Sequence, residues 1–113
     1  MNKETTNVEA ELDLISIIAR DPNVIFKHEL ILTEDLFTDA FTIAAYKFIN
    51  SQYRQGDFII VPSLFSKNEE DQEALKNALD RSAPEGAYSS LVETLSDLLV
   101  LRRLVRLSSN LVY

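Results

Sequence analysis

The final segment of the chain, residues 88–112, carries an apolar stripe that changes face halfway along. On a helical projection at about 100° per residue, the apolar residues of 88–99 fall within one arc. From Val100 onward the apolar residues fall on the opposite side, and polar residues take the first arc. One compact domain cannot easily bury both faces of a straight helix, so this reversal limits the folds that are open to the chain.

Two structures fit this reversal. Either the helix breaks near residue 100, or it continues and its second half meets another surface. No Gly or Pro lies between Ala87 and Tyr113, so we expect a continuous helix. Its first half would pack on the domain's own core, and its second half would need a partner, either the same helix of another copy or a following segment. The predicted interface residues are Val100, Leu101, Leu104, Val105, Leu107, Arg102, Arg103 and Arg106.

The three arginines lie opposite the apolar residues of this second half. They could bind phosphate, or they could form a face that is solvated or ion-paired. The formal net charge of the chain is −7, and an acidic protein repels nucleic acid. No aromatic residue lies among the arginines. We therefore expect an ion-paired or solvated face and no direct binding of nucleic acid by this domain.

The composition argues against a catalytic centre. Gly56 and Gly86 are the only glycines, too few and too far apart for a phosphate-binding loop or a dinucleotide fingerprint. There is no cysteine and His28 is the only histidine, which excludes thiolate and two-histidine metal sites. The acids of 69–73 fit a solvated first turn of a helix. We predict no catalytic, cofactor-binding or metal-binding residue.

The same features indicate a location. A chain of 113 residues without cysteine suits a single domain in the reducing cytoplasm. No apolar run reaches the length of a membrane span, and the charged opening lacks the apolar core of a signal peptide. We expect a cytoplasmic protein that does not contact the membrane.

Helix signals along the chain predict an all-α fold. Thr6 opens a capping-box pattern before a helix that should stop ahead of Asp21-Pro22. Asp21 can then cap a short helix that starts at Pro22. We expect Leu36 and Phe37 to face inward from a short helical piece.

A second helix signal begins at Asp39, which can cap a helix over 40–55. Gly56 fits the left-handed position that follows a helix. The predicted inward stripe of this helix is Phe41, Ala44, Ala45, Phe48, Ile49 and Tyr53.

Residues 58–61 (FIIV) form an apolar run without a second strand to pair with, and we expect an extended connector that plugs the core. Pro62 should start a helical turn with Leu64 and Phe65 inward. Ser66 opens a second capping box before a helix over about 68–80. The residues that this helix is expected to bury are Leu75, Ala78 and Leu79.

Several segments resemble the N-terminal domain of replicative DNA helicases of the DnaB type. NVEAELDLISII followed by Asp-Pro resembles the opening of that domain. Further matching positions are Leu32, Asp35, Phe37, Ile49, Gly56, Ile59, Ser63, Leu64, Arg102 and Leu104. The chain departs from the family at Thr42, where a histidine is common, and at Ile60, where an acid is usual. Residues 66–97 are also shorter than the family shows.

The resemblance implies a compact multi-helix head followed by a long helix that starts a helical hairpin. We accordingly expect a disordered tail over 1–6, a helical head over 7–99, and the start of a hairpin for oligomerisation over 100–113. In the family, hairpins pair between subunits and the domains form a collar on a hexameric ring. The collar binds primase and, in some systems, a helicase loader.

The resemblance also implies that this fragment is not an enzyme. ATP and magnesium belong to a motor domain that the chain lacks. The alternative function is a freestanding helical adaptor, or a domain like the helicase-binding domain of primase, that binds a replication protein.

Overall fold

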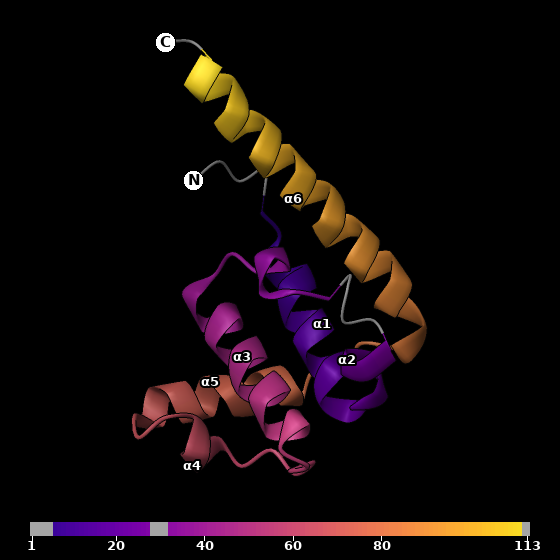
Figure 1. Ribbon diagram of the computed structural model, residues 1–113. Helices are drawn as coiled ribbons and strands as arrows, with labels where there is room; N and C mark the ends of the chain where they lie inside the picture. Colours follow the sequence, from indigo (N-terminus) through magenta and orange to yellow (C-terminus); the bar gives the residue numbers. More distant parts are fainter. Residues whose placement is uncertain (1–5, 28–31, 112–113) are drawn as a thin grey trace.

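The computed structural model describes residues 6–27 and 32–111, and this part of the chain is all-helical, as predicted (Figure 1). No strand occurs within these two ranges. The elements in chain order are α1 (Val8–Arg20), α2 (Asn23–Lys27), η2 (Glu34–Leu36), α3 (Ala40–Arg54), α4 (Pro62–Phe65), α5 (Glu69–Leu79), η3 (Glu85–Ala87) and α6 (Tyr88–Leu111). The predicted disordered tail and His28 fall largely or wholly outside the described ranges.

Helix α1 is the centre of the head, since it packs against α3, α5 and α6. Leu14, Ile15 and Ile18 are fully buried. The helix ends at Arg20 before Asp21-Pro22, as predicted. Its cap was predicted wrongly: Asn7, rather than Thr6, accepts a hydrogen bond from the Ala10 amide at 3.0 Å. Asparagine caps a helix at least as well as threonine, so the helix begins one residue later.

Residues 23–27 and 32–37, on either side of 28–31, contribute side chains to the core. The Asp21 carboxylate accepts a hydrogen bond from the Asn23 amide, as expected of a cap for α2. Leu36 and Phe37 are buried, which confirms the prediction for this piece. The Phe37 ring stacks on Tyr46 with 4.9 Å between centroids. The segment is therefore fixed to the core just before α3 begins.

Helix α3 is capped by Asp39, as predicted, through hydrogen bonds from two amides of its first turn. Its buried face is rotated relative to the predicted stripe, because Ala44 is exposed and Thr42 and Tyr46 are buried. Both hydroxyls are satisfied in the interior: Thr42 bonds to Glu11 and Tyr46 donates to the Leu32 carbonyl. Burial of polar groups is tolerated only with such partners, which the sequence pattern does not show.

Gly56 ends α3 with φ of +89°, the left-handed conformation that was predicted for it. The Asp57 amide donates to the Gln52 carbonyl at 2.9 Å, and the Gly56 amide donates to the Tyr53 carbonyl at 3.1 Å. These two bonds form a Schellman motif, which fixes the direction in which the chain leaves the helix.

The connector after Gly56 was predicted to plug the core, and this prediction was wrong. Phe58, Ile59 and Val61 are exposed; Ile60 packs against the core, and Phe58 touches it through the Tyr53 ring. Successive side chains of an extended segment point to opposite sides, so four in a row cannot all face one core. Leu64, predicted to face inward, is 65% exposed.

Helix α4 starts at Pro62, as predicted, and packs against α5. Phe65 is partly buried against Phe41 and Phe48 of α3. Helix α5 is capped by Asn68 rather than Ser66. The Ser66 hydroxyl instead accepts from the Asn68 amide and donates to Asp71. Leu75 and Ala78 are buried as predicted, while Leu79 is only partly buried.

Polar contacts join the segment after α5 to α1. The Arg81 guanidinium donates to Glu9 at 2.7 Å and to Asp13 at 2.9 Å. These two hydrogen bonds raise the pKa of Arg81. Arg20 donates to the Ala83 carbonyl. The chain is thereby positioned to enter α6 alongside the head.

Helix α6 is continuous from Tyr88 to Leu111, which confirms the prediction of an unbroken helix. Its first half packs along α1, and its second half extends beyond the head (Figure 1). No helix in 6–27 or 32–111 is both long and apolar enough to cross a membrane.

Candidate assembly surface

The second half of α6 carries an exposed row of aliphatic side chains, which we call the seam. The seam residues are between 40% and 57% exposed: Val100, Leu101, Leu104, Val105 and Leu107. Earlier on the same helix, Val92 is 7% exposed and Leu95 is 1% exposed. The reversal in the sequence therefore corresponds to a change from a buried apolar face to an exposed one.

The arginine face of the second half turns toward the head. Arg102 donates a hydrogen bond from Nη2 to the Asp35 carbonyl oxygen at 2.9 Å. Arg103 Nη2 lies 3.5 Å from the Asp35 carboxylate. Asp35 belongs to η2, so one residue of the head contacts two arginines of α6. Arg103 is thus ion-paired, as expected for the arginine face.

The arginines and the head together line a hollow of about 390 Å³. Its lining residues are Asp35, Phe37, Thr38, Ile43, Leu99, Arg102, Arg103 and Arg106. Burial lowers the pKa of Arg102, the Glu11 carboxylate opposes this change, and the charges of Arg103 and Arg106 add to it. The guanidinium groups therefore crowd one another at the junction between helix and head.

A buried carboxylate supports this junction from within. Glu11 of α1 is 0% exposed and accepts hydrogen bonds from the Thr38 amide at 2.8 Å and the Thr38 hydroxyl at 2.6 Å. The Thr42 hydroxyl also donates to Glu11 at 2.6 Å, and the Asp39 amide donates at 3.3 Å. Four donors around one carboxylate satisfy its charge and fix the start of α3. No sequence pattern indicated this cluster, because Glu11 lies 27 to 31 residues before its donors.

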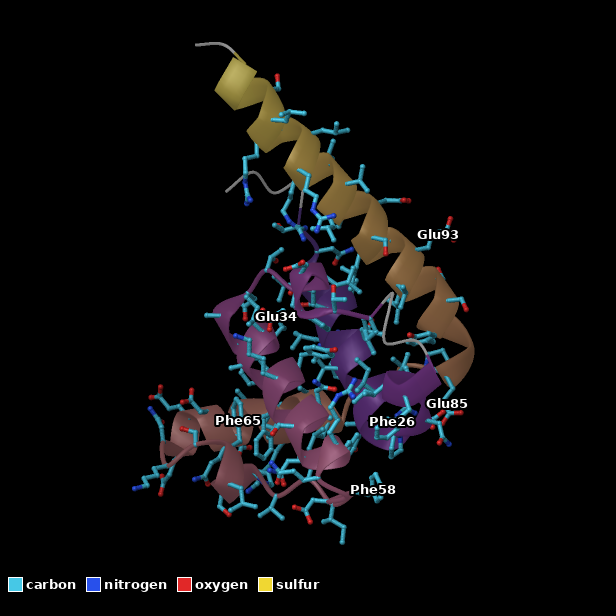
Figure 2. All side chains as sticks on the ribbon, viewed as in Figure 1. Phe26, Glu34, Phe58, Phe65, Glu85 and Glu93 are labelled. Atoms are coloured by element: carbon cyan, nitrogen blue, oxygen red, sulfur yellow. The ribbon has the colours of Figure 1, made fainter. Side chains whose placement is uncertain are left out.

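A second exposed apolar surface lies on the connector. We call it the connector surface, and it consists of Phe58, Ile59, Val61 and Leu64, between 39% and 80% exposed. These residues line a hollow of about 530 Å³ together with Gln52, Gly56 and Asp57. Phe58 lies at the end of the molecule opposite the free end of α6 (Figure 2).

The acids of the α5 N-terminus face solvent, as predicted. Within residues 6–27 and 32–111, no group of three or more His, Asp or Glu side chains is placed to hold a metal ion. Two exposed apolar surfaces stand out among the described residues, the seam and the connector surface, and exposed apolar surface of this kind is typical of a contact with another macromolecule.

Comparison with protein-family models, with curated proteins and with solved structures found no match to this chain.

Proposed function

We propose that this chain is a non-catalytic assembly domain that binds another copy of itself through the seam. The observation that carries the proposal is the exposed row of five aliphatic residues on a helix whose first half is anchored in the core. A helix with one covered apolar face and one uncovered apolar face fits a subunit contact.

The expected association is weak. Fully burying a Val or Leu side chain contributes about 1.5–3 kcal/mol. The seam residues are already about half covered, so covering the rest adds on the order of 5 kcal/mol per copy. Lost translational and rotational freedom costs about 4–15 kcal/mol. Association should therefore depend strongly on protein concentration.

The wider role that we propose is that of the N-terminal domain of a DnaB-type replicative helicase. The resemblance of the sequence supports it, and so does an all-helical head that leads into a long helix. In this role the domain would help to assemble a hexameric collar in the cytoplasm and would bind primase or a loader. ATP and magnesium would act only in a separate motor domain.

Light scattering across a concentration series tests self-association. We expect the average mass of the wild-type chain to rise with concentration and that of Leu104→Asp to stay at the monomer value. Asn77→Asp is the matched control, since it adds the same charge at an exposed site on α5 and should behave as wild type. A wild-type chain that stays monomeric throughout would contradict the proposal.

A second experiment addresses the replication role. The chain, immobilised at one end, should capture the C-terminal domain of the primase from the same genome. If the chain self-associates but does not capture primase, the proposal of an assembly domain is retained and the proposed link to primase is contradicted. Binding of a different replication protein in place of primase would favour the helical adaptor.

A further inference from the structure

The seam and the connector surface, both built from described residues, lie at opposite ends of the molecule. The seam occupies the free half of α6, and the connector surface lies at the far side of the head (Figures 1 and 2). The Cα atoms extend over 48 Å along the longest axis but only 25 Å along the shortest. In such an elongated molecule, one copy cannot bring its own seam to its own connector surface.

The connector surface is held in a fixed shape. The Schellman motif at Gly56 sets the direction of the chain, and the Phe58 ring packs on Tyr53 with 5.7 Å between centroids. Ile60 in the middle of the segment and Phe65 directly after it pack against the core. The hollow is therefore preformed, and its apolar walls match the class of groove that receives one face of an amphipathic helix.

The two surfaces carry opposite charge. From Leu98 to Leu111, α6 has three arginines and no acid. From Gly56 to Glu73, the chain has five acids and a single basic residue, Lys67. Asp57 lines the hollow itself, and the other four acids are exposed at the start of α5, which packs against α4. A basic apolar helix and an acidic apolar groove attract each other.

Pairing of two seams lacks this attraction. On the helical projection, Arg103 lies about 40° from Leu107 and Arg102 lies about 60° from Val105, so an arginine flanks each edge of the seam. Two seams in contact would bring arginines together along both edges; residues 98–111 contain no acid, and Asp35 of the head is already paired with Arg103. Charge therefore favours the connector surface over a second seam as the partner.

We infer that the seam of one copy docks on the connector surface of the next copy. This inference rests on the proposed function, because it names the surface that covers the seam. The contact is heterologous: each copy uses its seam toward one neighbour and its connector surface toward the other. Repetition of such a contact produces a closed ring, or an open chain if the rotation does not close.

Mixing two defective variants tests this inference. Leu104→Asp removes the seam, and Ile59→Asp removes the connector surface at a residue that is 80% exposed. We expect each variant alone to be monomeric by light scattering. An equimolar mixture should form dimers of one copy of each, since one intact seam and one intact connector surface remain. Leu64→Asp should behave as Ile59→Asp does, and Asn77→Asp should assemble as wild type.

Other outcomes separate this inference from the proposed function. If Ile59→Asp assembles as wild type while Leu104→Asp is monomeric, the seam pairs with a seam or with another surface, and only the inference is overturned. If both variants are monomeric and the mixture stays monomeric, the inference is overturned as well. A monomeric wild type overturns both.

Salt provides an independent readout on the unmodified chain. Attraction between arginines and acids is screened by salt, so docking on the connector surface should weaken as the salt concentration rises. Pairing of two seams would instead strengthen, because salt screens the repulsion between arginines. Association that strengthens on addition of sodium chloride would overturn the inference.

Discussion

The two halves of α6 are made of the same kinds of residue and have opposite surroundings. Leu95 in the first half is 1% exposed, while Leu104 in the second half is 57% exposed, although both lie on one continuous helix. The difference arises from the extent of the head. The head covers the first half with α1 and reaches the second half through η2, where Asp35 contacts Arg102 and Arg103. Helix formation alone therefore does not decide which apolar residues become core.

The largest expected effect comes from Glu11, the buried carboxylate that supports the junction between α6 and the head. Glu11→Ala should destabilise the fold by about 3–5 kcal/mol, because it leaves buried donors of Thr38 and Thr42 without an acceptor. Urea unfolding followed by circular dichroism measures this loss. Glu9→Ala, which removes an exposed carboxylate of the same helix, is the control and should cost less than about 1 kcal/mol. Equal losses in the two variants would contradict the structural role of Glu11.

The second prediction compares the halves directly with the same substitution. Leu95→Ala should cost about 2–5 kcal/mol, since it leaves a cavity in the core. Leu104→Ala should cost less than about 0.5 kcal/mol in dilute protein, where the seam faces water. Urea unfolding at low protein concentration gives both values. A similar cost for the two would mean that the seam is part of the monomer's own core.

The third prediction concerns the polar contact between Asp35 of the head and the second half of α6. Asp35→Ala removes the carboxylate partner of Arg103 but keeps the carbonyl that Arg102 uses. Both charged side chains of the ion pair are more than half exposed, so the loss should be below about 1 kcal/mol. Thermal unfolding at low and high salt measures it, and a loss of several kcal/mol would show that this contact holds the second half in place.

The smallest expected effect is on nucleic acid. Replacing Arg102, Arg103 and Arg106 together by Ala should leave DNA binding unchanged, because the acidic chain repels phosphate and Arg103 is paired with Asp35. Fluorescence anisotropy with a labelled oligonucleotide tests this. Submicromolar, salt-sensitive binding by the wild type that the triple variant loses would overturn it.

Local signals in the sequence predicted the helices well. Pro22 and Pro62 mark real boundaries, and Gly56 ends α3 in the conformation that glycine favours. The reversal at Leu99 and Val100 predicted a change of environment, and the absence of Gly and Pro between Ala87 and Tyr113 predicted the continuous helix. Each of these features depends on residues that are close in the chain, so periodicity and backbone preferences were sufficient.

Features that depend on distant residues were missed. Burial of Glu11 and Thr42 requires their mutual hydrogen bonds, and exposure of Ile59 depends on how the connector crosses the head. The caps were predicted at Thr6 and Ser66, whereas Asn7 and Asn68 cap the two helices. Several neighbouring residues of each segment can cap a helix, so the sequence did not distinguish them. The connector surface was accordingly unforeseen, and the role of the seam in assembly stays a prediction.

Hydrogen exchange along α6 tests the contrast between its two halves most directly. Amides of 88–99 should be protected at every protein concentration, since that half is packed on the head. Amides of 100–111 should exchange quickly in dilute protein and slow down as concentration rises and the seam is covered. Protection of 100–111 that equals that of 88–99 in dilute protein, or that does not change with concentration, would contradict an assembly surface on the second half of α6.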